Sequence, residues 1–205
     1  DTPEKLASDM YKVSGNMGDY EKALEMAKNT ARAEKFMTER GVKWDGRLLK
    51  LGGHSEPRVL VSIGDGAGLL NALWTHMKTL KNLETRLHTK ADEIILDKDG
   101  KVEGLEVRQD YYFDTPETDD LQNKTGTKKL IKAKQGVIFA TGGYSRDKAF
   151  RSIEVPFLAG VATTTNPGAT SGALKTMVRA GAQPMHLSLF RFAYPLPTED
   201  MIWGV

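Results

Sequence analysis

The 205-residue chain contains 29 Lys and Arg, 27 Asp and Glu and no Cys, with a formal net charge of +2. This balance gives no electrostatic reason to expect nucleic acid or a membrane surface as a partner. The lack of Cys excludes disulfides, thiolate catalysis, iron–sulfur clusters and Cys-attached haem within the chain. No apolar run approaches the roughly 20 residues of a membrane span. We assign no metal site, and the compartment, cytoplasm or periplasm, stays open.

The first forty residues have the apolar spacing of amphipathic helices, so we predict a helical stretch over residues 3–40. Asp19 is placed to cap a helix, and Gly41 is placed to end the last one. Residues 41–58 are expected to form a loop. A lone histidine in such a loop, His54, is more often a surface residue than a ligand, and we give it no role.

Residues 64–68, Gly-Asp-Gly-Ala-Gly, follow a predicted strand at 58–63 and precede an apolar helix. The arrangement imitates the G-x-G-x-x-G fingerprint of dinucleotide-binding domains. The match fails at its third glycine, where Leu69 stands, and Asp65 would bring a carboxylate towards a pyrophosphate. Despite these two mismatches, an NAD-binding dehydrogenase domain is an alternative interpretation of the segment. A non-enzymatic α/β module, whose glycine turns serve folding alone, is another.

Residues 84–133 have the pattern of a β-meander. The predicted strands are 83–87, 91–96, 102–107 and 130–133. Asp99 and Gly100 form the strongest hairpin signal in the chain. The polar stretch 113–128 is expected to be a long loop between two of the strands.

Residues 136–140, Gly-Val-Ile-Phe-Ala, form a short apolar run that predicts a buried strand. The run is followed by Gly142 and Gly143, which let the backbone turn sharply and let a ligand approach because no Cβ intervenes. Ser145 is then placed to cap a helix. Such a strand–turn–helix unit is where α/β proteins hold nucleotides, although glycine pairs also occur in ordinary loops.

Residues 163–168 offer hydroxyl and N–H groups just before a helix predicted at 171–180. This arrangement suits an anionic or hydroxyl-rich ligand, or an ordinary capped turn. The residues of the helix expected to face inward are Leu174, Met177 and Val178. Alternating side chains then predict a strand over residues 183–195.

Two of these segments together resemble motifs of the fumarate reductase/succinate dehydrogenase flavoprotein family. Residues 140–144, Ala-Thr-Gly-Gly-Tyr, are similar to its A-T-G-G-[FY] segment. Residues 164–169, Thr-Thr-Asn-Pro-Gly-Ala, are similar to its T-N-x-P-G-A stretch. The resemblance runs from Ala31 to Pro195 and is nearest to flavocytochrome-type fumarate reductases and relatives such as urocanate reductase.

The resemblance implies an α/β fold that is part of a Rossmann-like FAD-binding domain, with an inserted antiparallel β-meander and an N-terminal helical stretch. It implies FAD as cofactor, with the backbone of Ala91 against the adenine. The other cofactor contacts that it implies are Ala140, Thr141, Gly142, Gly143, Thr165, Gly168 and Gly172. Many relatives carry Gly-Asp-Gly where this chain has residues 171–173, Ser-Gly-Ala, so that acid is missing here.

The activity that the resemblance implies is FAD-dependent reduction of the C=C bond of an unsaturated carboxylic acid of the fumarate or acrylate type. The electron donor is unknown. Tyr194 stands in Ala-Tyr-Pro where fumarate reductases have Ala-His-Pro, so we expect it to contact the substrate. A neutral phenol cannot pair with a second carboxylate as a charged histidine can, which disfavours fumarate. The alternative is a tyrosine packed at the domain edge.

The same resemblance suggests how the chain is divided. Residues 1–195 are expected to be a partial FAD-binding domain without its N-terminal G-x-G-x-x-G unit, and residues 196–205 to start a capping domain. The chain begins at Asp1 without Met, so we expect a piece of a longer protein. This piece is expected to be inactive alone and to bind FAD weakly, and the family's Arg proton donor would lie outside it.

Overall fold

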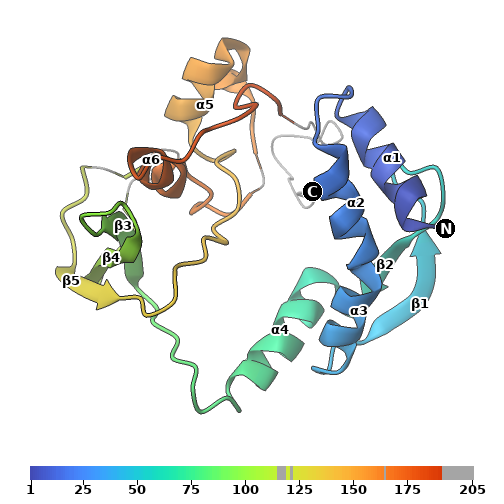
Figure 1. The fold of residues 1–205 in the computed structure, drawn as a ribbon, viewed down its shortest axis with the longest axis horizontal. Coiled ribbons are helices and arrows are strands. Elements are labelled where there is room, and N and C mark those ends of the chain that lie inside the picture. The colour runs from blue at the N-terminus through green and yellow to red at the C-terminus, as the bar shows by residue number, and fades with distance from the viewer. Residues whose placement is uncertain (115–118, 121, 164, 191–205) are drawn as a thin grey trace. The chain divides into compact units, whose positions relative to one another are not determined.

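The computed structural model describes residues 1–114, 119–120, 122–163 and 165–190. The chain divides into two compact units, Asp1–Thr85 and Arg86–Val205, which are described separately. Figure 1 labels the helices and strands of both units. The mixture of helices and antiparallel sheets agrees with the predicted α/β FAD-binding fold.

Three helices open unit 1, which confirms the predicted helical stretch over residues 3–40. They are α1 Pro3–Val13, α2 Tyr20–Lys28 and α3 Thr30–Thr38. As predicted, Asp19 caps α2, because its carboxylate accepts the N–H of Lys22 at 3.1 Å. Helices α1 and α2 lie side by side, with Ala7 and Ala27 buried.

A strand pair and a longer helix complete unit 1. Strand β1, Trp44–Leu49, pairs antiparallel with β2, Val59–Ser62. The β2 prediction is confirmed, but the prediction of a loop throughout 41–58 is wrong. Strand β1 lacks a clear alternation of apolar residues, and its hydrogen bonds to β2 stabilise it instead.

The glycine-rich turn at residues 64–68 opens helix α4, Asp65–Met77. Gly64 has φ +80°, and a Cβ on Gly68 would lie 1.9 Å from the carbonyl oxygen of Ile63. Both glycines are therefore needed for the tight junction of strand and helix. This packing role accounts for the resemblance to a dinucleotide fingerprint without any ligand.

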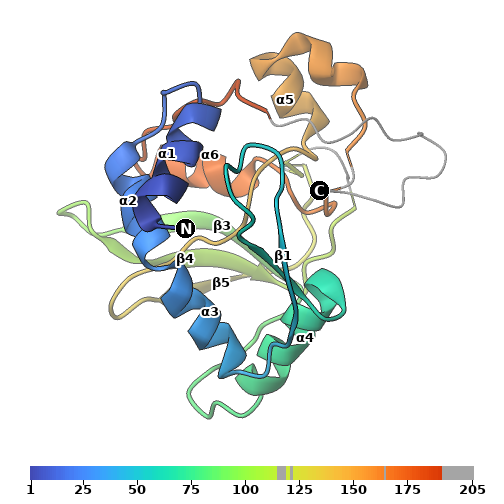
Figure 2. The same cartoon turned by 90° about the vertical axis from the view of Figure 1, so that its right-hand side faces the viewer.

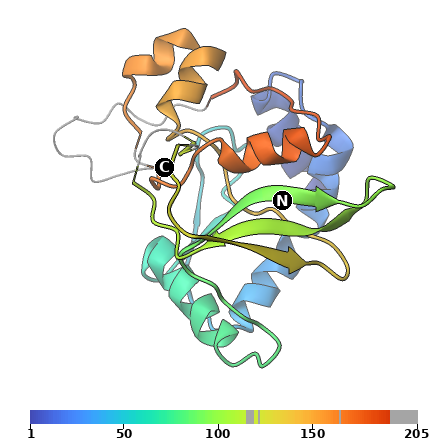
Figure 3. The same ribbon diagram turned by 90° about the vertical axis from the view of Figure 1, so that its left-hand side faces the viewer.

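Unit 2 is built on a three-stranded antiparallel sheet, whose strands run side by side in Figures 2 and 3. Its strands, in the order β3-β4-β5, are β3 Thr89–Leu96, β4 Val102–Gln109 and β5 Thr127–Lys132. The hairpin between β3 and β4 turns as predicted, with Gly100 at φ +78° donating its N–H to Asp97. The strand predicted at 83–87 is wrong, because that segment pairs with no described strand.

Three helical segments accompany the sheet. They are α5 Lys148–Glu154, the 3-10 helix η1 Pro156–Gly160 and α6 Gly172–Arg179. Helix α6 lies against β3, where Thr176 donates its hydroxyl to the carbonyl oxygen of Asp92 at 2.8 Å. Val178 was predicted to face inward from α6, but it is 40% exposed. The buried side chain of this helix is that of Thr176 instead.

Two predictions around the glycine turn are wrong. The cap of α5 is Asp147 rather than Ser145, because the Asp147 carboxylate accepts the N–H of Phe150 at 2.9 Å. Residues 136–140 form no strand, and Ile138 is 93% exposed, since no described strand lies beside them to complete a ladder.

The strand predicted over 183–195 is absent from residues 183–190. Pro184 cannot donate to a ladder, and His186 adopts φ +55°, which an extended strand does not permit. Residues 191–195 lie outside the described residues.

Candidate functional site

Unit 2 contains two pockets, and most of the residues predicted to bind a cofactor line one or the other. The first, of about 410 Å³, is the glycine-turn pocket, formed by residues 141–144, parts of α6 and residues 183–189. The second, of about 310 Å³, is the charged pocket, formed by β3, β4, α6 and residues 119–128. Thr141, Gly142 and Gly143 line the glycine-turn pocket, whereas Ala91 and Gly172 line the charged pocket.

The glycine turn presents bare backbone to its pocket. Gly142 has φ +76°, a conformation that favours glycine. A Cβ built on Gly142 or on Gly143 would meet no protein atom within 4 Å. Residues 141–143 are exposed, so the space in front of them is accessible. A flat ligand could therefore lie directly against the main chain here. Ala140 adjoins the turn but does not line the pocket.

The far wall of the glycine-turn pocket is residues 183–189, held by Tyr144. The hydroxyl of Tyr144 donates to the carbonyl oxygen of Leu187 at 2.6 Å. Its ring makes edge-to-face contacts with Phe150 and Phe190, at centroid distances of 5.1 and 5.7 Å. The pocket lining contains no Asp, Glu, Lys or Arg. Such a mainly apolar surface with a few polar groups is typical of sites for aromatic cofactors.

Residues 145–147, directly after the first flavoprotein-like segment, are bonded to the second segment and to Ser171 just beyond it. Ser145 Oγ lies 3.0 Å from Thr165 Oγ1, and the N–H of Arg146 donates to Ala169 at 3.0 Å. The buried carboxylate of Asp147 accepts the N–H of Ser171 at 3.1 Å and its hydroxyl at 2.5 Å. The glycine turn and the loop before α6 therefore form one unit.

Thr165 and Gly168, both predicted to bind the cofactor, lie in that loop with polar groups that already have partners. The hydroxyl of Thr165 lies 3.0 Å from that of Thr163 as well as from Ser145. The N–H of Gly168 donates to the side chain of Asn166 at 2.8 Å. Neither residue lines the two pockets. Any contact of theirs with a ligand would use the outer surface of the loop.

Ala91 lies next to an irregularity of the β3–β4 ladder. It faces Val107, and the register shifts between Ala91 and Glu93. The extra residue is Asp92, whose carbonyl oxygen accepts hydrogen bonds from α6 instead of β4. Bulges of this kind occur frequently beside binding sites because they redirect the backbone. No local pattern of residues indicates this bulge.

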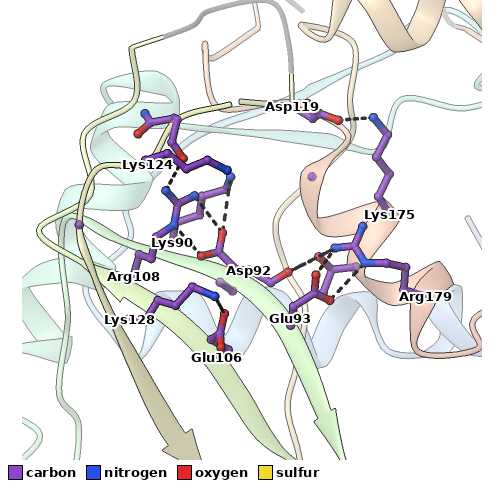
Figure 4. Close-up of a pocket in the computed structure, with 15 residues that line it drawn as sticks. Lys90, Asp92, Glu93, Glu106, Arg108, Asp119, Lys124, Lys128, Lys175 and Arg179 are labelled. Carbon is purple, nitrogen blue, oxygen red and sulfur yellow. Dashed lines mark hydrogen bonds and ion pairs between the residues drawn. The ribbon is translucent and has the colours of Figure 1, made fainter. Parts of the chain in front are cut away.

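The charged pocket is lined by more basic than acidic side chains, and most of them form ion pairs (Figure 4). Arg108 makes a two-pronged contact with the Asp92 carboxylate, at 2.6 and 3.1 Å. The other pairs in this pocket are Lys90–Asp92, Lys128–Glu106, Arg179–Glu93 and Lys175–Asp119. These carboxylates take up most of the positive charge, so the pocket is not an open anion site.

Arg108 is also the residue that ties the loop after β4 to the sheet. Its guanidinium is buried and donates to the carbonyl oxygens of Asn123 and Thr125, at 2.6 and 3.0 Å. Its hydrogen bonds to Asp92 raise the pKa of the guanidinium further. Nearby, burial and then the Asp120 carboxylate raise the pKa of Tyr111. Sequence reasoning missed this cluster, because an Arg on a strand carries no signal of its distant partners.

In unit 1, Arg58 and Asp9 hold residues 52–55, Gly-Gly-His-Ser, in place through hydrogen bonds and ion pairs. Arg58 pairs with the carboxylates of Asp1 and Asp9, and Ser55 donates both its N–H and its hydroxyl to Asp9. The hydrogen bonds from Arg58 and Ser55 hold the pKa of Asp9 well below its usual range. His54 lies 3.5 Å from Arg58 and within this network. The network supports the loop and needs no ligand.

The comparison with protein families shows to which family the chain belongs. A family model described as "FAD binding domain" matches residues 1–201. The chain belongs to the FAD binding domain family. Its cofactor is therefore FAD, as predicted, and the suspected relationship to flavoprotein reductases is confirmed.

Curated relatives of this FAD-binding domain are flavoenzymes. The chain is 33% identical to an "Acrylate reductase flavoprotein subunit" of Shewanella woodyi, over 92% of this chain and 36% of that protein. It is 28% identical to a "Urocanate reductase" of Eggerthella lenta, over 100% of this chain and 31% of that protein. The chain thus spans about a third of the length of these relatives.

Solved structures show the same fold. A flavocytochrome c3 fumarate reductase in its open conformation superposes with a TM-score of 0.75 at 22% identity, covering 89% of this chain and 30% of the other. Tyr194, the predicted substrate contact, lies outside the described residues. Among the helices that the structure describes, none has the length and apolar character needed to cross a membrane.

Proposed function

We propose that this chain forms part of an FAD-dependent reductase that acts on the C=C bond of an unsaturated carboxylic acid. The similarity to an acrylate reductase and a urocanate reductase supports the substrate class. The observation that carries the proposal is the glycine-turn pocket, where two side-chain-free residues border open space inside an uncharged hollow. That surface fits the flat, aromatic part of FAD.

Gly142 and Gly143 are the residues that would lie closest to the cofactor, with Ala140 and Thr141 completing the turn. Ala91 and Gly172 would contact FAD from the charged pocket, and Thr165 and Gly168 from the outer surface of their loop. The division of the chain is proposed as well: residues 1–195 form the FAD-binding part, and residues 196–205 begin a capping domain.

When bound, FAD supplies the hydride for the substrate. The residues of this chain hold and shield the reacting groups. Leu187 and Leu189 line the pocket with apolar side chains. In this proposal Tyr194 would donate a hydrogen bond to the substrate. No proton donor is assigned to this chain, and the electron donor stays unspecified.

The direct test is the visible flavin spectrum of the purified intact protein, followed by its bleaching and recovery under anaerobic conditions. After reduction, acrylate, urocanate and fumarate are added in separate reactions. Reoxidation by acrylate or urocanate, faster than by fumarate, would support the proposal. A protein that carries no flavin, or flavin that none of the three acids reoxidises, would refute it.

A further inference from the structure

Residues 183–190 form the far wall of the glycine-turn pocket without any helix or strand. Within the described part of the chain, their hydrogen bond to the rest of unit 2 is the one that Leu187 accepts from Tyr144. The remaining backbone hydrogen bond of the segment is internal, from Leu189 to His186. Among the described residues, the bond from Tyr144 is therefore the hydrogen bond that can hold the wall in position.

Tyr144 is well placed to hold that wall. It follows Gly143 directly, so its backbone belongs to the glycine turn on the near side of the pocket. Its ring packs between Phe150 of α5 and Phe190 at the end of the wall. Burial, with a smaller effect from Glu154, raises the pKa of Tyr144, so its hydroxyl stays protonated and remains a donor near neutral pH.

We propose that Tyr144 is a positioning residue that fixes the distance between the glycine turn and residues 183–190, and thereby sets which substrates fit. The proposal rests on the proposed function, because it assumes that cofactor and substrate meet in this pocket. Residues 183–187 and 189 line the same hollow as the glycine turn. Movement of the wall would therefore change the width of the hollow on the substrate side while leaving the glycine turn, and with it the cofactor, in place.

The test is Tyr144→Phe in the intact protein, which removes the hydroxyl and keeps both ring contacts, so the variant is expected to fold. A matched control is Tyr112→Phe, also in unit 2, where Tyr112 is 61% exposed and lines neither pocket. The first readout is amide hydrogen exchange. Loss of one neutral hydrogen bond should speed exchange of the Leu189 N–H, which donates to His186, roughly fivefold in Tyr144→Phe and leave the control unchanged.

The second readout is steady-state kinetics with acrylate and urocanate at equal flavin content. Tyr144→Phe should raise KM by roughly three- to tenfold with kcat changed less than about twofold, because the wall affects substrate binding more than the chemical step. The preference between the two acids should shrink. A merely structural role would instead lower the flavin content and the activity together.

The two readouts keep the proposals separate. Unchanged exchange of the Leu189 N–H, or faster exchange spread evenly over unit 2, would overturn the positioning role whatever the enzyme does. If exchange becomes faster only in the wall but the KM values do not change, the proposal that Tyr144 sets which substrates fit would also be overturned. If the wild-type protein carries no flavin, the proposed function fails, and the exchange result still decides whether Tyr144 holds the wall.

Discussion

The glycine turn can be tested by a substitution that separates cofactor binding from folding. Gly143 does not have a left-handed φ, and a Cβ there meets no protein atom within 4 Å. Gly143→Val should therefore change the free energy of unfolding of the flavin-free protein by less than about 0.5 kcal/mol. If the flavin lies against this backbone, however, the new side chain occupies its place.

The expected size of the effect follows from that overlap. A branched side chain cannot move away from a ligand in contact with its own backbone, so we expect the FAD dissociation constant to rise at least tenfold, about 1.4 kcal/mol. Flavin fluorescence titration of the flavin-free protein measures the constant, and urea unfolding measures the stability.

A matched control is Gly160→Val. Gly160 also has open space at its Cβ and no left-handed φ, but it lies in η1 and lines neither pocket. The control should bind FAD as the wild type does. Wild-type flavin occupancy in Gly143→Val would show that the glycine serves the turn alone and would refute the reasoning.

Three further predictions concern Arg108, Asp9 and Tyr194. Arg108→Met removes the Arg108 donor from the Asp92 carboxylate and from the carbonyl oxygens of Asn123 and Thr125, so urea unfolding should show a loss of roughly 3 kcal/mol, with little loss in the exposed control Lys129→Met. Because the folded-state pKa of Asp9 is depressed, the stability that its ionised carboxylate contributes is fully present above its ordinary pKa and is lost as the pH falls further. Asp9→Asn should flatten this dependence of the free energy of unfolding on acid pH, and an unchanged acid unfolding curve would contradict the prediction. Tyr194→Phe should lower kcat/KM on the best substrate roughly tenfold with flavin content unchanged, and wild-type kinetics would favour a tyrosine packed at the domain edge.

Local signals in the sequence predicted the elements that depend on neighbouring residues. The Asp19 cap, the hairpin turn at Gly100 and three of the four strands predicted for the meander follow from spacing within a few residues. The glycine turn was predicted for the same reason, since two adjacent glycines indicate an unusual backbone wherever they occur.

Features that depend on distant residues could not be predicted in the same way. Residues 136–140 have the composition of a buried strand, yet they pair with no described strand. The pairing of Arg108 with Asp92, and the bulge at Asp92 that α6 bonds, join residues far apart in the sequence. Composition shows that a residue can form such a contact, and only the fold shows with which partner.

The link between the two flavoprotein-like motifs explains why their joint presence was informative. Glycines that face a ligand have no side chains with which to fix themselves, so neighbouring residues must support them. Here Ser145 and Asp147, just after the first motif, provide that support by bonding Thr165 in the second motif and Ser171 just after it. Ser171 stands at the start of the stretch where many relatives carry Gly-Asp-Gly, and the buried Asp147 accepts both of its donors. An acid thus lies at this junction, supplied by the residues that follow the first motif, and the two stretches stay joined although the chain departs from the family pattern.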